Sequence, residues 1–164
     1  MTPSPRSWTT ILLVLLASPL TADEVSDAWS EGRSAFASGD YAAALDAFER
    51  AKSGNQSGPA VYYNIGVSQY RLQDYAAARR TFTLLDKRFP AMRPLAQYNL
   101  GLVALKLGRA DVARRHFRSS YLLAGDDPKL RALASTQLRR LVDDSEPAAE
   151  WLRASRHVPV TTTT

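Results

Sequence analysis

The sequence predicts an all-α protein, an α-solenoid of three helix–turn–helix units followed by a C-terminal capping helix. The first observation is a six-residue segment at 39–44 that recurs almost unchanged at 73–78 and more weakly at 108–113. The second is a set of landmark residues in phase with it: Gly32, Gly66 and Gly101, then Phe48, Phe82 and Phe117. The glycines are 34 and then 35 residues apart, a period typical of stacked helical hairpins.

Composition fits one soluble domain and excludes several kinds of site. The 164-residue chain is 45% apolar and 23% charged, as in an ordinary globular domain. It has no cysteine, and its two histidines are too few for a histidine-based metal site, so we expect neither a metal nor another cofactor. The net charge of +5 is too small to indicate nucleic-acid binding.

Residues 1–22 have the order of an export signal peptide. Arg6 precedes an apolar run at 11–17, Pro19 ends that run, and Ala22 is a small residue before Asp23. The run is too short to span a bilayer. We therefore expect cleavage near Ala22 and an exported, periplasmic protein; the alternative is a short uncleaved anchor. Cleavage removes Arg6 and leaves a net charge of +4.

The domain at 23–144 divides into units at about 25–58, 59–92 and 94–127. In the first unit, a helical face begins near Val25, Gly39 suits a left-handed helix end, and Asp40 suits an N-cap. The connector at 91–94 is expected to hold the one inserted residue. Asp127 and Pro128 predict the start of the capping helix at 128–144, and residues 145–164 are expected to form a flexible tail.

The three units resemble those of the tetratricopeptide repeat (TPR) family, over about residues 25–144. The second unit carries most of the family pattern: Tyr62, Ile65, Gly66, Tyr75, Ala78, Phe82 and Pro90. The first unit departs from it at Glu31 and Gln56, and the third has Ala110 in place of the tyrosine. From side-chain size, we expect the landmark glycines to face Ala44, Ala78 and Ala113 of the paired helices. The phenylalanines should fill the space between consecutive hairpins.

The resemblance implies that the first helices of the units line a concave face, which binds extended peptides or partner helices. The predicted peptide-binding residues are Trp29, Arg33, Tyr63, Asn64, Tyr70, Arg71, Tyr98, Asn99 and Lys106. Aromatic rings supply contact area, and side-chain amides can pair with a peptide backbone. The alternative is that these aromatic residues serve packing and that Asn64 and Asn99 bond to nearby backbone.

One groove of the TPR family grips a C-terminal carboxylate with lysines, asparagines and an arginine. Asn64 matches that pattern, but Trp29 and Leu95 stand where cations are expected. The departure argues against binding of cytosolic chaperone tails. On the second helices, Arg79, Arg80, Arg114 and Arg115 form a basic strip on the outer side. The strip suits weak contact with an anionic membrane surface, or is simply a solvated face.

Enzymatic motifs are missing from the sequence. There is no glycine-rich phosphate loop and no plausible Ser-His-Asp set, and His116 reads as a surface residue. The sequence therefore predicts a non-enzymatic scaffold that binds a peptide or helix of an envelope partner. The alternative is a structural or assembly factor for an outer-membrane or peptidoglycan-associated complex, which acts by self-association or bridging.

Overall fold

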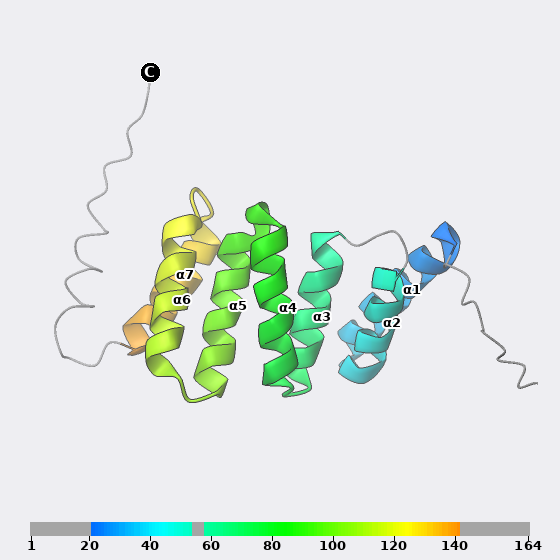
Figure 1. Cartoon of the computed structure of the whole chain (residues 1–164), viewed down its shortest axis with the longest axis horizontal. Coiled ribbons are helices and arrows are strands. Elements are labelled where there is room, and N and C mark those ends of the chain that lie inside the picture. The colour runs from blue at the N-terminus through cyan, green and yellow to red at the C-terminus, as the bar shows by residue number, and fades with distance from the viewer. Residues whose placement is uncertain (1–20, 54–57, 142–164) are drawn as a thin grey trace, which may run out of the picture.

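The structure is a computed structural model that describes residues 21–53 and 58–141. These residues form seven α-helices and no strand. The helices are α1 (Ala22–Ser38), α2 (Tyr41–Ser53), α3 (Pro59–Arg71), α4 (Tyr75–Arg88), α5 (Arg93–Lys106), α6 (Ala110–Leu123) and α7 (Pro128–Leu141). Figure 1 shows them side by side in chain order along the long axis of the molecule. The predicted signal peptide, apart from its last two residues, and the tail lie outside the described residues.

Helix α1 begins earlier than the predicted start at Val25. Thr21 and Glu24 form a capping box, in which the Glu24 N–H donates to Thr21 Oγ1 over 3.3 Å and the Thr21 N–H donates to Glu24 Oε2 over 2.7 Å. This local arrangement places Ala22 at the first helical position. Cleavage near Ala22 would therefore cut the chain within the first turn of α1. Among the described residues, no helix is long and apolar enough to cross a membrane.

The two helices of each hairpin are joined by the same tight turn. Gly39 ends α1 with a left-handed φ of 85°, and Asp40 Oδ1 accepts a hydrogen bond of 3.0 Å from the Ala43 N–H, as predicted. Gly108 takes the equivalent place in the third unit with φ 70°. In the second unit a non-glycine residue, Gln73, adopts φ 64°. The turn geometry is thus retained even where the side chain disfavours it.

The connections between hairpins also follow local signals. The connector predicted at 91–94 is shorter in the structure, because a 3-10 turn, η1, covers Pro90–Met92 and α5 already begins at Arg93. The Asp127 carboxylate accepts a hydrogen bond of 3.0 Å from the Leu130 N–H, and Pro128 is the first residue of α7. Both predicted roles at the start of α7 are therefore confirmed.

Each hairpin is closed by a glycine that lies against a phenylalanine ring. A Cβ added to Gly32, Gly66 or Gly101 would lie 2.6, 2.7 or 2.5 Å from Cε1 of Phe48, Phe82 or Phe117, respectively. The nearest atoms to each glycine are therefore those of a phenylalanine ring, and the expected contact with the alanines stays a prediction. Side chains on a helix lean toward its N-terminus, so each ring reaches back over the turn that holds Ala44, Ala78 or Ala113. These alanines are fully buried and leave room for the ring.

The same rings join consecutive hairpins, as expected. All three phenylalanines have no exposed surface. Phe48 packs in one cluster with Val61 and Ile65 of α3, and Phe82 packs with Leu100 of α5. Phe117 shares a cluster with Leu138 of α7. The core is therefore a row of similar clusters rather than a single centre, and each hairpin depends on its neighbour.

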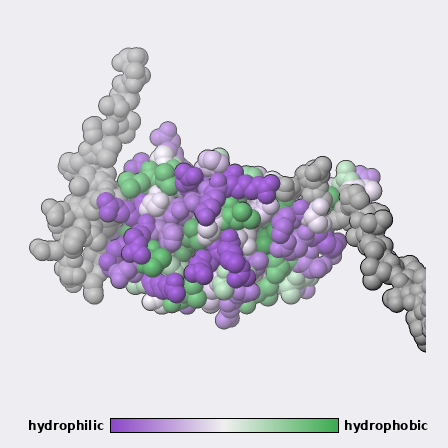
Figure 2. All heavy atoms as spheres, viewed as in Figure 1, coloured by the Kyte–Doolittle hydropathy of each residue, from purple (hydrophilic) through white to green (hydrophobic). Residues whose placement is uncertain are grey.

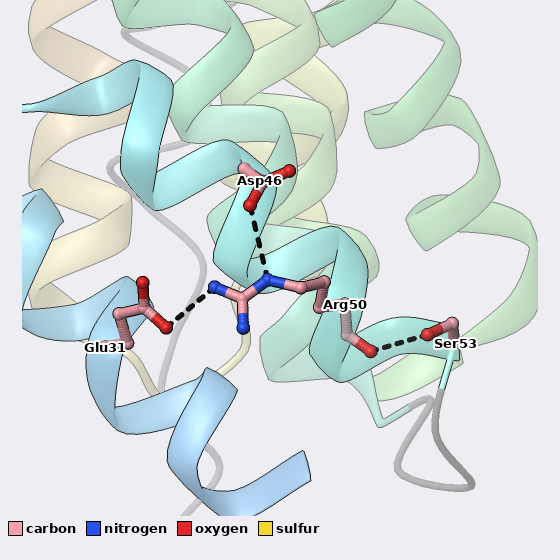
Figure 3. A network of polar contacts seen from close by, with 4 residues as sticks. All are labelled: Glu31, Asp46, Arg50 and Ser53. Carbon is pink, nitrogen blue, oxygen red and sulfur yellow. Dashed lines mark hydrogen bonds and ion pairs between the residues drawn. The ribbon is translucent and has the colours of Figure 1, made fainter. Parts of the chain in front are cut away.

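The first unit has Glu31 where the TPR pattern has an apolar residue, and the structure gives the reason. Ile65 and Leu100, which hold the same position in the second and third units, are buried against the preceding unit, whereas Glu31 lies at the exposed end of the stack. Arg50 of α2 bridges Glu31 (2.7 Å) and Asp46 (3.2 Å), as Figure 3 shows. These side chains are largely exposed, so the pairs contribute little to stability. Within the part of the chain that the structure describes, a leucine at position 31 would have no preceding hairpin to cover it.

Candidate functional site

The predicted peptide-binding tyrosines lie on the first helices of the second and third units. The Tyr63 ring is 6.4 Å from the Phe82 ring, and the Tyr98 ring is 5.6 Å from the Phe117 ring, measured between centroids. Both tyrosines are half-buried. Each ring is thus anchored on the core of its own hairpin while part of it stays accessible. We call the surface made by α1, α3 and α5 the inner face.

Asn99 of α5 acts electrostatically on Tyr63 of α3 across this face. Burial raises the pKa of Tyr63, and the nearby Asn99 side chain partly opposes that effect. Asn99 Nδ2 donates to the backbone oxygen of Leu95 over 2.8 Å. The amide is therefore held in place by its own helix and presented to the neighbouring unit.

Tyr70 completes a group of polar aromatic residues on the inner face. Its ring packs edge-on against Tyr75 at 5.5 Å. Burial raises the pKa of Tyr70, and the nearby Tyr75 and Tyr98 raise it further, while Arg71 lowers it. Tyr98 also raises the pKa of Tyr63. Tyr63 and Tyr70 pack against one core cluster and Tyr98 packs against the next, and we call Tyr63, Tyr70, Tyr98 and Asn99 the tyrosine cluster.

The other predicted polar residues are arranged around this cluster in different ways. Asn64 Nδ2 donates to the backbone oxygen of Ala60 over 2.8 Å, so part of its amide serves its own helix, as the packing alternative expected. Arg33, Arg71 and Lys106 are exposed. The Arg71 guanidinium lies 5.7 Å from the centre of the Tyr41 ring. Neither α3 nor α5 contains an acidic residue, so the local charge of these two helices is positive.

Trp29 contributes to packing in the first unit. Its ring centre is 5.4 Å from that of Phe48. It also lines a hollow of about 100 Å³ with Val25, Ala51 and Val61, between the first hairpin and α3. The structure thus places Trp29 one unit away from the tyrosine cluster, where its ring helps join the first hairpin to the second.

Sequence reasoning missed two aromatic residues beside the site. Tyr41 packs edge-on against Phe36 at 5.2 Å and also meets Arg71 of the next unit, and Tyr75 packs on Tyr70. The 34-residue recurrence of Tyr41 and Tyr75 was the available signal. We read it as a repeat landmark, although the same recurrence places both rings at the hairpin turns that border the inner face.

The outer basic strip is less uniform than its sequence suggests. Figure 2 shows the side on which α4 and α6 lie toward the viewer, where hydrophilic residues predominate between small hydrophobic patches. Arg79, Arg80 and Arg115 are exposed. Arg114, however, donates to the backbone oxygen of Leu141 over 2.8 Å. It thereby bonds the carbonyl of the last residue of α7, a structural role that removes it from a freely accessible strip.

His116 is not the simple surface residue that the sequence suggested. It is half-buried, and its Nδ1 lies 2.8 Å from Gln97 Oε1, while Gln97 Nε2 donates to Asp86 Oδ1 over 2.9 Å. Burial and the nearby Arg115 lower the pKa of His116, although Asp86 opposes them. This chain of contacts connects α4, α5 and α6. Within residues 21–53 and 58–141, no group of three or more histidine or acidic side chains is placed to hold a metal ion.

Comparison with known families agrees with this geometry. The sequence profile of the family described as tetratricopeptide repeat matches residues 30–93 and 63–128, which together make up more than half of the chain. The chain belongs to the tetratricopeptide repeat family. Its three hairpins are therefore TPR units. No curated protein sequence matches the chain significantly.

Solved TPR structures share the fold at low sequence identity. PcrH from Pseudomonas aeruginosa is 20% identical, with a TM-score of 0.66, and the match covers 78% of this chain and 96% of PcrH. The type III secretion chaperone SycD of Yersinia enterocolitica, in complex with a peptide of the translocator YopD, is 14% identical with a TM-score of 0.65. The match covers 83% of this chain and 97% of SycD. The first TPR of Spaghetti (RPAP3), bound to the HSP90 peptide SRMEEVD, is 17% identical with a TM-score of 0.63. The match covers 74% of this chain and 93% of the Spaghetti chain.

Proposed function

We propose that this protein is a non-enzymatic scaffold that binds a peptide or helix of a cell-envelope partner on its inner face. The observation that carries the proposal is the tyrosine cluster, in which half-buried rings and a positioned amide span two TPR units. Such rings supply large contact area at low entropic cost, and tyrosine is enriched among residues that dominate binding energy. The exposed Arg33, Arg71 and Lys106 favour a segment that also carries acidic residues.

Two further observations support this function. The similar SycD structure contains a translocator peptide, and the TPR of Spaghetti contains an HSP90 peptide, so the fold is suited to holding peptides. The envelope location is proposed from the signal-like pattern at 1–22. Weak contact with an anionic membrane surface through Arg79, Arg80 and Arg115 stays a prediction.

The test is a double substitution, Tyr63→Ala with Tyr98→Ala, followed by capture of partners from envelope extract. We expect capture to fall by at least about tenfold, because truncation removes two central contact rings. The matched control is Tyr121→Ala, which removes a half-buried tyrosine from α6 instead. Circular dichroism must show that both variants keep their helices. Unchanged capture by a folded double variant would rule out the inner face as the binding surface.

A further inference from the structure

A hollow on the opposite side of the stack lies between α4, α5 and α6. Its volume is about 180 Å³. An apolar cavity of about 150 Å³ can hold a benzene molecule, so this hollow has room for one aliphatic side chain. The floor is apolar, and the rim carries charge. The lining residues of the floor are Leu100, Val103, Ala104, Leu107 and Val112, and those of the rim are Arg79, Thr83, Arg109 and His116.

The rim carries two exposed arginines, and the nearest acidic influence on it is that of Asp86 on His116. Arg79 and Arg109 are both exposed, and neither has an ion-pair partner among the described residues. No aspartate or glutamate lines the hollow. His116 has a lowered pKa because of burial and Arg115, and its Nδ1 is engaged with Gln97. The hollow therefore combines an apolar floor with two arginine side chains at its rim.

The equivalent place one unit earlier has different chemistry. There, Asp74 stands where the third unit has Arg109, and Gln69 stands where it has Ala104. The Gln69 Oε1 accepts a hydrogen bond of 2.7 Å from Thr81 Oγ1, so a polar side-chain contact crosses that interface. In the third unit, the small Ala104 leaves the space open. The small Ala104 and the positive Arg109 are thus departures from the preceding unit.

We propose that this hollow is a second docking point, for a partner segment that places an aliphatic side chain next to a carboxylate. The aliphatic group would lie on the floor around Ala104 and Val103. The carboxylate would lie at the rim beside Arg79 and Arg109, since a guanidinium group can bind a carboxylate through two parallel hydrogen bonds. Because the hollow and the tyrosine cluster lie on different faces, a scaffold with both sites occupied would join two partners.

The test is an NMR titration of the ¹⁵N-labelled full chain with a capped peptide of alternating leucine and glutamate residues. We expect amide shifts confined to α4, α5 and α6 around the hollow. The pair Arg79→Gln with Arg109→Gln should weaken binding about fivefold or more. The control pair, Arg80→Gln with Arg115→Gln, removes the same charge from α4 and α6 outside the hollow and should change affinity less than about twofold.

A second variant tests the floor. Ala104→Gln introduces the side chain of the preceding unit and should abolish the preference for the leucine peptide over one with alanines in place of leucines. Equal weakening by both arginine pairs would overturn the proposal, because it would indicate general charge attraction. Shifts on Tyr63, Tyr98 and Asn99 alone, or no shifts up to about 10 mM peptide, would also overturn it. None of these results depends on whether the inner face binds a partner.

Discussion

Replacing Phe82 with alanine is expected to lower the free energy of unfolding by about 3–5 kcal/mol. Phe82 is fully buried, lies under Gly66 of its own hairpin and shares a cluster with Leu100 of the next. Its removal opens a cavity at two interfaces at once, within the central unit of a stack that depends on neighbour contacts. Because whole domains are stable by only about 5–15 kcal/mol, the variant should be close to unfolding.

Urea unfolding followed by far-ultraviolet circular dichroism measures this loss. The matched control is Leu84→Ala on the same helix, since Leu84 is 44% exposed and leaves little cavity when truncated. We expect the control to lose less than about 1 kcal/mol. Equal losses in the two variants would contradict the role of Phe82 as the joint between the second and third units.

The second large effect is expected from Gly101→Ala. The added Cβ would lie 2.5 Å from Cε1 of Phe117, a distance at which the ring or the helix must move. Such overpacking costs about 1–3 kcal/mol. Alanine regains up to about 1 kcal/mol through its better helix propensity, so the net result should still be destabilising.

A double-mutant cycle with Phe117→Leu identifies the cause. If the clash with the ring is responsible, Gly101→Ala should cost markedly less in the Phe117→Leu background, with a coupling of about 1 kcal/mol or more. Additive losses would show that the cost at Gly101 arises elsewhere. A stabilising Gly101→Ala would show that helix propensity outweighs the contact.

Local signals in the sequence predicted most of the fold. The Gly39–Asp40 turn and the Asp127–Pro128 helix start depend on a few adjacent residues, and the structure has both. The start of α1 was missed because Thr21 had been assigned to the signal peptide, although its spacing to Glu24 is that of a capping box.

Contacts between helices were harder to predict than the helices themselves. Size alone suggested that glycine meets alanine, but the lean of side chains along a helix also brings the Phe48 ring to within contact of Gly32. The effect of Asn99 on Tyr63 acts between two units, so it depends on how the hairpins stack. Repeat spacing placed both residues on one face without showing that they interact.

The hollow beside Ala104 also could not be predicted from the repeat pattern. The hollow lies where this unit differs from the preceding one. Ala104 stands at the repeat position that Gln69 holds one unit earlier, and Arg109 stands at the position of Asp74. A comparison of units for their differences, in addition to their similarities, would have drawn attention to these positions. Whether they leave space depends on the side chains of three helices together.

The central claim is that the inner face, and the tyrosine cluster in particular, is the surface that holds the partner. Site-specific photo-crosslinking tests it most directly, with benzoylphenylalanine placed at Tyr98 in one protein and at Arg80, on the outer side of α4, in another. We predict that illumination in intact cells joins the partner from position 98 and not from position 80. Crosslinking of the same partner from position 80 alone, or equally from both positions, would contradict the claim.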